Sequence, residues 1–528
     1  MQFQPYDVII VGAGVSGLYA AINLDSRLKV LLLAKKEFTL CNSALAQGGV
    51  AAVLDKQSDD VERHISDTLA AGGYENNLQN LRILVENGAS NIEELVRLGV
   101  HFDREPDGTI ALGLEGGHSR NRIAHYKDST GYEIVTALIQ KVKSLANVDY
   151  LEYAHLLRLE KHQNGFCAEV YCENTVALRY SMSSDLLGAE PRPVALRYYY
   201  TTPICLIATG GIGRVYHYTT NSAIATGDGI QLAHNLGAKV EKMSLIQFHP
   251  TAFAGAGGSP DISEREAFLI TEAARGEGAF LYNRDMERFM HRYEPQIGET
   301  YNMELSPRDV VSRCIIAEQK RTGSGEFYLD ISHLDSDFIK ERFPMIYGRL
   351  LEKGYDFTKQ PVPIYPCQHY LMGGIAVTGE GKTTVEGLYA AGECAYTGVH
   401  GVNRLASNSL LEALVFSRLA AESINAELEV ELERPRTIPA PCAGKAVFAL
   451  TGTKPLPEGL RSEIRAIMQK AFFVVPDLEQ AQKGLTRVTA IKALLESGEF
   501  ELTPDFAEAK SLATVAYLIL KEVIENVT

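Results

Sequence analysis

The chain has 528 residues, of which 46% are hydrophobic and 22% are charged, and its formal net charge is −15. This length is too great for one compact core and predicts roughly two to four domains of an ordinary folded protein. The acidic balance, with no block of Lys or Arg, argues against a nucleic-acid-binding protein. No apolar run approaches the about 20 residues of a membrane span, so we expect no membrane insertion.

The first residues run straight into an apolar stretch, without the basic region and cleavage site of a secretory signal. We therefore expect a cytoplasmic protein. Its eight cysteines are scattered, with no C-x-x-C pair and no Cys/His cluster at metal-ligand spacing. We expect reduced, mostly buried thiols, no metal site and no iron–sulfur cluster on this chain.

A glycine-rich turn near the N-terminus lies between a predicted strand, residues 7–11, and a predicted helix, residues 18–24. The turn carries the G-x-G-x-x-G pattern from Gly12 to Gly17, and a second strand is predicted at 29–33. In such a βαβ unit the backbone approaches a pyrophosphate at the helix N-terminus, so the pattern predicts a dinucleotide site. The acid that usually binds the adenosine ribose is absent where Lys35 stands. Lys35 is either a contact to the phosphates or adenosine edge, or a solvated surface lysine.

Three further segments suit a ligand, although each alone also fits an ordinary loop or turn. Residues 42–49 are small and end in a Gly pair, which lets a flat ring lie against backbone. Residues 115–122 form a polar loop with both charge signs. Asp228 could hold a ribityl or ribose hydroxyl, or could cap a turn or helix. Around them we expect helices over residues 59–98 and a smaller β-layer over residues 150–159 and 166–200.

The remaining chain divides by composition into an insertion and a helical region. The segment from about residue 240 to 355 differs in its sequence pattern from the segments before it, and we interpret it as a cap domain that can close over a ligand. Beyond about residue 420, prolines such as Pro435, Pro439 and Pro441 predict a linker. Helices are predicted at 459–473, 477–497 and 505–525, and we expect a bundle without chemistry.

One stretch, residues 387–412, combines three features that face ligands in other proteins. A short apolar strand ends at Gly392 and Glu393, which can bring backbone and a carboxylate to a ligand's hydroxyls. Residues 407–409 then cap an apolar helix, whose N-terminus suits electron-rich oxygens. Arg404 lies between them as a fixed cation. Packing alone does not explain this combination.

With these residues in view, the chain resembles the succinate dehydrogenase/fumarate reductase flavoprotein family over roughly residues 5–420. The resemblance rests on eleven motifs in the same order: GAGVSG, ALAQGGVA, EGGHSR, ATGG, TGDG, FHPT, TEAARGEG, SPRDVVSR, HYLMGG, GLYAAGE and HGVNRLASNSLLE. It implies an α/β fold: a Rossmann-like FAD-binding domain with an inserted α+β capping domain and a C-terminal helical bundle. We expect the FAD-binding domain at 1–240 and 356–422, the capping domain at 241–355, and the linker and helical domain at 423–528.

The resemblance also implies which residues bind FAD. Carried over position by position, they are Ala13, Gly14, Val15, Ser16, Lys35, Asn42, Ser43, Ala44, Leu45, Ala46, Gln47, Gly48, Gly49, Ala154, Asp228, Glu393, Ser409 and Leu410. In the electron-transport members a histidine links covalently to the flavin at the place of Asn42. We therefore expect non-covalent FAD.

The substrate site that the resemblance implies is a dicarboxylate site. His249, Thr251, Thr271, His369 and Arg404 would hold the two carboxylates, and Arg308 would lie over the reacting carbons as proton donor or acceptor. A guanidinium suits a carboxylate because it grips it through paired hydrogen bonds. Glu115 decides between family members, since a carboxylate repels succinate or fumarate but accepts the ammonium of aspartate. Whether Glu115 or Arg308 takes the ammonium proton stays open at this point.

We therefore expect FAD-dependent oxidation of L-aspartate to iminosuccinate, with O2 (giving H2O2) or fumarate as electron acceptor. This would be the first step of quinolinate and NAD biosynthesis, with quinolinate synthase as pathway partner. The alternatives are a soluble fumarate reductase or succinate dehydrogenase flavoprotein subunit, and a flavin-binding protein without turnover. The first predicts co-purification with an iron–sulfur subunit, and the second predicts a damaged substrate site.

Overall fold

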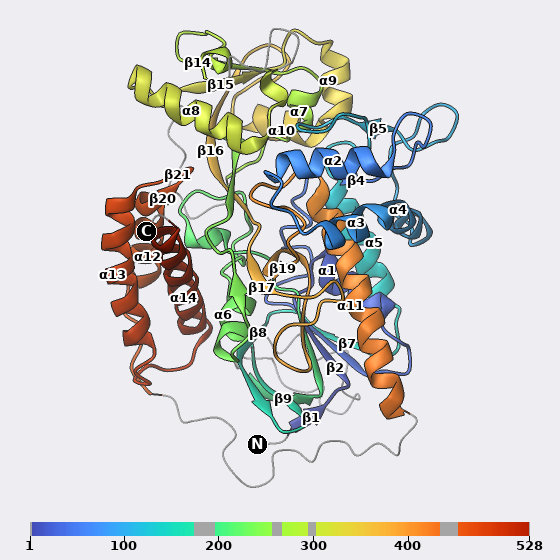
Figure 1. Ribbon diagram of the computed structural model, residues 1–528, viewed down its shortest axis with the longest axis vertical. Coiled ribbons are helices and arrows are strands. Elements are labelled where there is room, and N and C mark those ends of the chain that lie inside the picture. The colour runs from blue at the N-terminus through green and yellow to red at the C-terminus, as the bar shows by residue number, and fades with distance from the viewer. Residues whose placement is uncertain (1–2, 174–195, 256–266, 294–302, 433–451, 527–528) are drawn as a thin grey trace, which may run out of the picture.

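The computed structural model describes residues 3–173, 196–255, 267–293, 303–432 and 452–526. Figure 1 shows a central sheet region, a capping layer at one end and a separate helical layer at one side. The prolines Pro435, Pro439 and Pro441 of the predicted linker lie outside the described residues.

A parallel five-stranded sheet forms the centre of the FAD-binding region, in the order β18-β11-β2-β3-β7. Its strands are β2 (Val8–Val11), β3 (Val30–Leu33), β7 (Val148–Leu151), β11 (Ile204–Ile207) and β18 (Leu388–Ala390). Alternate side chains of β2 enter two different cores, Val8 and Ile10 on one face and Ile9 and Val11 on the other. A parallel sheet is covered on both faces in this way because its crossovers lie outside it.

Helices cover one face of this sheet. They are α1 (Val15–Asn23), α2 (Val61–Ala71), α3 (Leu78–Glu86), α4 (Gly88–Arg97), α5 (Thr130–Lys143) and α11 (Asn408–Leu432). Helix α11 continues well past residue 423, where the sequence predicts the linker to begin. It continues because Ala420, Ala421, Ile424 and Leu428 recur at helical spacing and are buried.

A second, smaller sheet lies on the other face, in the order β1-β10-β9-β8. Its strands are β1 (Phe3–Pro5), β8 (Ala154–His162), β9 (Gly165–Cys172) and β10 (Leu196–Thr202). The predicted strand at 150–159 is therefore divided, since β7 joins the parallel sheet and β8 the smaller one. Tyr153, between them, has a left-handed φ of 57°, which turns the chain from one sheet to the other.

The capping region is an antiparallel sheet, in the order β13-β16-β15-β14, packed against helices around its own core. It comprises β13 (Ile246–Phe253), α7 (Ala273–Gly276), β14 (Phe280–Asn283), α8 (Arg308–Thr322), β15 (Phe327–Asp330), α9 (Ser336–Arg342), α10 (Pro344–Glu352) and β16 (Val362–Leu371). The cap sheet thus includes β16, beyond the predicted end of the insertion at 355.

Short elements complete the described chain. They are β4 (Val50–Ala51), β5 (Leu112–Gly113), β6 (Ile123–Ala124), η2 (Gly213–Val215), α6 (Asp228–Asn235), β12 (Val240–Glu241), η3 (Met290–Arg292), η5 (Met303–Leu305), β17 (Gly374–Ala376), η6 (Gly392–Cys394), β19 (Ala395–Tyr396), β20 (Phe472–Phe473) and β21 (Val475–Pro476).

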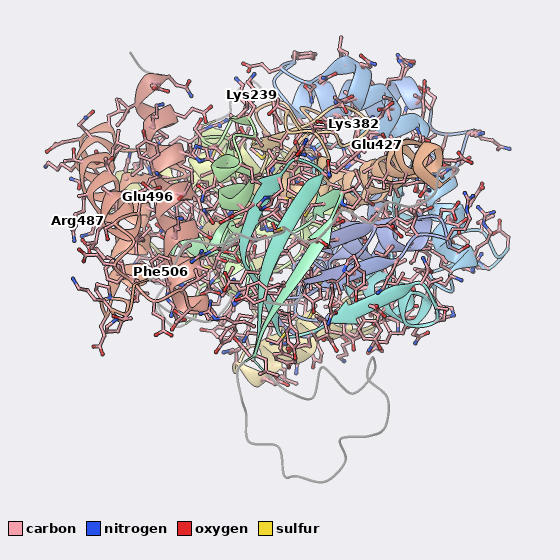
Figure 2. The ribbon with its side chains drawn as sticks, turned by 90° about the horizontal axis from the view of Figure 1, so that it is seen from below. Lys239, Lys382, Glu427, Arg487, Glu496 and Phe506 are labelled. Atoms are coloured by element: carbon pink, nitrogen blue, oxygen red, sulfur yellow. The ribbon has the colours of Figure 1, made fainter. Side chains whose placement is uncertain are left out.

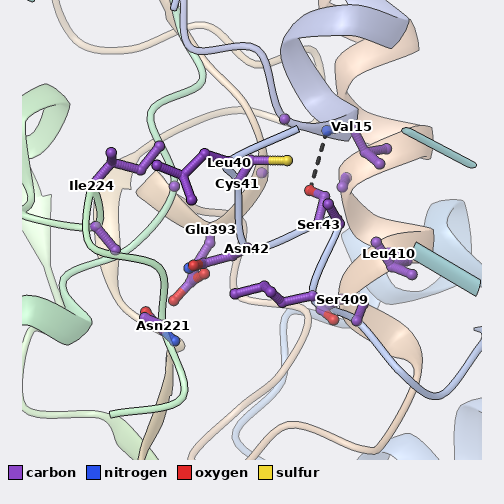
Figure 3. Close-up of a pocket in the computed structure, with 18 of the residues that line it drawn as sticks. Val15, Leu40, Cys41, Asn42, Ser43, Asn221, Ile224, Glu393, Ser409 and Leu410 are labelled. Atoms are coloured by element: carbon purple, nitrogen blue, oxygen red, sulfur yellow. Dashed lines mark hydrogen bonds between the residues drawn. The ribbon is translucent and has the colours of Figure 1, made fainter. Parts of the chain in front are cut away.

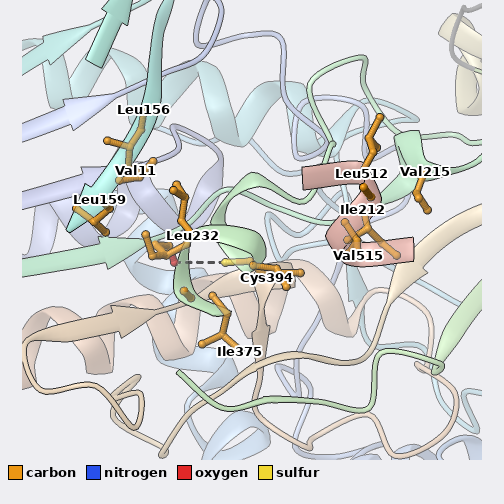
Figure 4. Packing of buried hydrophobic residues seen from close by; sticks show 14 of the residues in the cluster. Val11, Leu156, Leu159, Ile212, Val215, Leu232, Ile375, Cys394, Leu512 and Val515 are labelled. Atoms are coloured by element: carbon orange, nitrogen blue, oxygen red, sulfur yellow. Dashed lines mark hydrogen bonds between the residues drawn. The ribbon is translucent and has the colours of Figure 1, made fainter. Parts of the chain in front are cut away.

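The C-terminal bundle consists of α12 (Leu460–Ala471), α13 (Leu478–Leu495) and α14 (Pro504–Glu525). Figure 2 shows it as a layer of its own, with Arg487 on its outer side. Its inner helix α14 packs on α6 and η2, where Leu512 and Val515 join the core around Ile212 and Val215 (Figure 4). Among the described residues, no helix is both long enough and apolar enough to cross a membrane.

The close approach of α1 to the backbone at Gly12, just after β2, requires glycine at position 17. A Cβ there would lie 1.9 Å from the carbonyl oxygen of Gly12. We expect Gly17→Ala to destabilise the protein by at least about 1–3 kcal/mol, because neither backbone segment can move aside cheaply. Gly348→Ala in α10 is the matched control, since its Cβ would meet nothing within 4 Å and alanine favours a helix by roughly 0.5–1 kcal/mol. Thermal unfolding midpoints measure both, and a Gly17→Ala midpoint equal to that of the unchanged protein would contradict the expectation.

Candidate active site

A cavity of about 620 Å³ runs between the carboxyl ends of the parallel strands and the cap. It is within the range of small-molecule sites. All the residues predicted to bind FAD line it, as do Glu115, His249, Thr271, Arg308, His369 and Arg404. Thr251 does not line it: this buried residue lies behind His249 and donates its hydroxyl to the carbonyl of Ile270.

The N-terminus of α1 opens into this cavity. Its N-cap is Gly14, which has no side chain to cap the helix. The N–H of Val15 donates to Ser43 Oγ at 3.1 Å (Figure 3), and no side-chain cap satisfies the rest of the first turn. Free N–H groups at the positive end of a helix dipole suit phosphate oxygens, so this end fits the pyrophosphate of a dinucleotide.

Asn42 and Glu393 lie side by side in the middle of the cavity (Figure 3). The N–H of Ser222 donates to Asn42 Oδ1 at 2.8 Å, and that of Leu371 donates to Glu393 Oε1 at 3.1 Å. Burial raises the pKa of Glu393 to about 7, against the opposing effects of the Leu371 N–H, Arg404 and the Asn42 side chain. Nearby Asn221 Oδ1 is buried without a partner in the described chain, so the wall fits a hydroxyl-rich ligand such as the ribityl chain of FAD.

Lys35 is not a solvated surface lysine but the centre of a half-buried ion cluster at the far end of the cavity. Its Nζ donates to Thr226 Oγ1 at 2.8 Å and to Asp228 Oδ2 at 2.9 Å, and lies 2.5 Å from Glu508 Oε1. Glu508 belongs to α14, in which the sequence indicates no chemistry. Nothing in its local pattern distinguishes it from other helix glutamates, so sequence reasoning misses it.

The opposite end of the cavity holds a group of buried charges. Arg308 donates Nε to Glu272 Oε2 at 2.5 Å, and Glu272 also pairs with Arg275 at 2.9 Å. Gln247 Oε1 accepts from Arg308 at 2.9 Å and from Arg404 at 3.1 Å, so it joins the two arginines. Glu272 stands inside the TEAARGEG motif and Gln247 directly precedes FHPT, but neither is among the predicted site residues. The sequence signal that could have identified them is a polar residue next to an apolar one.

Burial would raise the pKa of Glu272, but Arg275 and Arg308 outweigh it and hold that pKa below its usual value. Burial and the charge of Arg308 lower the pKa of Arg404 to about 10. Arg404 also lies over the ring of Tyr370, 4.3 Å from its centroid, and donates to Ser409 Oγ at 2.7 Å. Its Nε has no partner among the described residues. The cluster thus holds one carboxylate ionised and leaves a donor free.

Two histidines complete this end, with ring centroids 5.0 Å apart. Burial, then Arg308, lowers the pKa of both His249 and His369 well below the usual range, so both are neutral. His249 Nδ1 accepts from the N–H of Thr251 at 3.3 Å, which places the proton on Nε2. That nitrogen has no partner in the described structure, and it is a donor available to a ligand.

Glu115 is buried at the same end, only 2% exposed. Its Oε2 accepts from Ser407 Oγ at 2.5 Å, while Oε1 is buried without a partner among the described residues. Burial, then the charge of Glu272, raises the pKa of Glu115, and Ser407 and Arg308 oppose this. The structure thus places Glu115, His249, His369, Arg308 and Arg404 on the lining of one cavity.

Comparison with known proteins agrees with this arrangement. Residues 7–410 match the family described as FAD binding domain. The chain is 41% identical to an L-aspartate oxidase of Clostridium perfringens over 80% of this chain and 87% of that protein. It is 37% identical to an L-aspartate oxidase of Acinetobacter baylyi over 98% of this chain and 90% of that one.

Solved structures show the same architecture at lower identity. A mutant FrdA of E. coli quinol fumarate reductase superimposes with a TM-score of 0.81 at 26% identity, covering 99% of this chain and 90% of that chain. The Mycobacterium smegmatis Sdh1 in complex with UQ1 gives 0.75 at 29% identity, covering 99% and 88%.

The ion cluster at Lys35 predicts a role for the C-terminal bundle in holding FAD. We expect Glu508→Gln to weaken FAD binding about tenfold, because Lys35 would then draw on Asp228 alone and leave it less able to accept from the cofactor. The control is Glu463→Gln, which breaks an exposed pair with Arg487 on the outer side of the same bundle. Titration of FAD into the cofactor-free protein, followed by flavin fluorescence, measures both. Equal affinities would contradict the expectation.

Proposed function

The chain belongs to the L-aspartate oxidase family of FAD-dependent oxidoreductases, and from this we propose that it oxidises L-aspartate to iminosuccinate. When bound, FAD supplies the two-electron acceptor for this oxidation. Residues from Ala13 to Ser16, the segment 42–49, and Lys35, Asp228 and Glu393 would hold it. Asn42 has an amide in place of a nucleophilic ring nitrogen, which favours non-covalent binding.

One observation carries the proposal: among the buried atoms of the cavity lining that have no hydrogen-bond partner in the described structure, three lie together on the charged side chains and histidine of this end. They are the donors Arg404 Nε and His249 Nε2, and the acceptor Glu115 Oε1. Buried polar groups are normally paired, so these atoms await a ligand. Donors together with one acid match a molecule that has two carboxylates and one ammonium. A plain dicarboxylate would leave Glu115 unsatisfied.

Arg404 and the two histidines would bind the carboxylates of aspartate. A guanidinium binds a carboxylate in a fixed orientation, and Gln247, Ser409 and the Tyr370 ring hold Arg404 in place. The histidines act as neutral donors because their pKa values are low. Arg308 from the cap closes the site, and its neighbour Thr271 lines the wall. Aspartate would thus be clamped with water excluded.

Glu115, rather than Arg308, would take the proton from the ammonium. Arg308 donates hydrogen bonds to Glu272 and to Gln247, and a guanidinium has donors but no acceptor for a proton. Glu115 has a raised pKa and an unpartnered oxygen, which suit a general base near neutral pH. Loss of the ammonium proton makes the nitrogen lone pair available as the Cα–H bond breaks, giving the imine.

We further propose that either O2, giving H2O2, or fumarate reoxidises the enzyme. Fumarate fits the same carboxylate donors, and Arg308 would donate a proton to it. The product would pass to quinolinate synthase in quinolinate and NAD biosynthesis, and the protein would work in the cytoplasm.

The test of the reaction is anaerobic reduction. L-Aspartate added to the FAD-loaded protein without oxygen should bleach the flavin absorbance, and fumarate should then restore it. Succinate should bleach it far less, because it offers no ammonium to Glu115. Bleaching by succinate but not by L-aspartate would instead support a fumarate reductase or succinate dehydrogenase flavoprotein, and bleaching by neither would support a binding protein without turnover.

The role of Glu115 is tested by Glu115→Gln, which keeps the size and removes the charge. We expect kcat/KM for L-aspartate to fall about a hundredfold, since both the ion pair and the base are lost. Fumarate reduction by a reductant should be kept or increased, because fumarate has no ammonium and the variant removes a carboxylate that repels it. Full L-aspartate turnover in this variant would refute the assignment.

A further inference from the structure

We propose that Ser407 is a positioning residue that determines specificity: its hydroxyl fixes the Glu115 carboxylate so that the other oxygen receives the substrate's ammonium. The inference deepens the proposed function and rests on it. Ser407 lines the cavity, yet it is not among the residues expected to bind either cofactor or substrate.

The Ser407 hydroxyl accepts one hydrogen bond and donates one, the latter to Glu115. Its Oγ accepts from the N–H of Gly49 at 3.2 Å, so its single proton is available to Glu115 Oε2 at 2.5 Å. A Cβ on Gly48 would lie 2.5 Å from Glu115 Oε1 and 3.3 Å from Ser407 Oγ. The Gly pair therefore leaves just enough room for the carboxylate and the hydroxyl to meet.

The backbone of Ser407 is held in an unfavourable conformation by buried neighbours. Its φ is 57°, in the left-handed region, which is unfavourable for a residue other than glycine. The carbonyl of Ala406 accepts from His118 Nε2 at 2.9 Å, and Asn408 contacts His64 Nε2 at 2.9 Å. The carbonyl of Ser407 itself accepts from the N–H of Ala51 at 3.2 Å. Glycine would be the relaxed choice here, so the presence of serine indicates a use for its hydroxyl.

The charges around Glu115 explain why a donor is needed. Glu272 opposes ionisation of Glu115, as burial does, whereas Arg308, Arg342 and Arg275 act in the other direction. The Ser407 hydroxyl adds a donor that stabilises the ionised form. Without it the pKa of Glu115 would rise further, and a protonated Glu115 cannot pair with an ammonium. The carboxylate would also be free to rotate away from its position.

Two variants test this, with binding measured by the change that a ligand causes in the flavin absorbance spectrum. In Ser407→Ala we expect the Kd for L-aspartate at neutral pH to rise about tenfold, while that for succinate changes less than about twofold. The acid limb of L-aspartate affinity should move to higher pH, because Glu115 would protonate earlier. Ser407→Gly relieves the backbone and also lacks the hydroxyl, so it should behave like Ser407→Ala.

The outcomes separate the inference from the proposed function. If the unchanged protein does not bind L-aspartate, the proposed function fails. If it binds L-aspartate and Ser407→Ala does so equally well, with the same acid limb, the inference is overturned. It is also overturned if L-aspartate and succinate are weakened alike, or if Ser407→Gly restores binding, since each indicates a purely structural role. In the Glu115→Gln background, Ser407→Ala should add no further loss for L-aspartate.

Discussion

The site depends on burying more positive than negative charge in one place. Arg275, Arg308 and Arg404 are buried with Glu115 and Glu272, which leaves this group with an excess of one positive charge while both acids are ionised. Buried ions are costly unless paired, so the arrangement is stable only because Glu272 and Gln247 hold the arginines in fixed hydrogen bonds. A guest with two carboxylates and one ammonium carries a net charge of −1 and balances this excess. The same buried charges that lower the stability of the unliganded protein therefore determine which ligand it binds.

This cluster also links the cap to the FAD-binding region. Glu272 and Arg308 belong to the capping elements, whereas Arg404 precedes α11 and Glu115 lies in the loop after β5. Gln247 on β13 receives one hydrogen bond from each side. The charged site is thus complete only where the capping elements contact the FAD-binding region, because the hydrogen bonds that hold the arginines cross the boundary between the two regions.

The parts of this structure that local sequence patterns determine could be predicted from the sequence. The glycine turn, the strands beside it and the helix after Ser409 follow from spacing, and the family motifs bring the five chemical side chains to one cavity. Contacts between residues that are far apart in the sequence could not be predicted in this way. Lys35 could be taken for a surface residue because Glu508, its partner, lies on the last described helix. The strand pattern at 150–159 likewise could not show that a left-handed residue, Tyr153, divides it between two sheets.

The pairing of Lys35 with Glu508 has a consequence for how the protein is made. The glycine turn, Lys35 and Asp228 all leave the ribosome well before α14 does. Until α14 has docked, Lys35 has one carboxylate near it instead of two. A nascent chain can thus form the nucleotide-binding turn early, but the ion cluster at Lys35 is complete only after the C-terminal bundle has folded onto it. Tight flavin binding would therefore indicate that the whole chain has been synthesised.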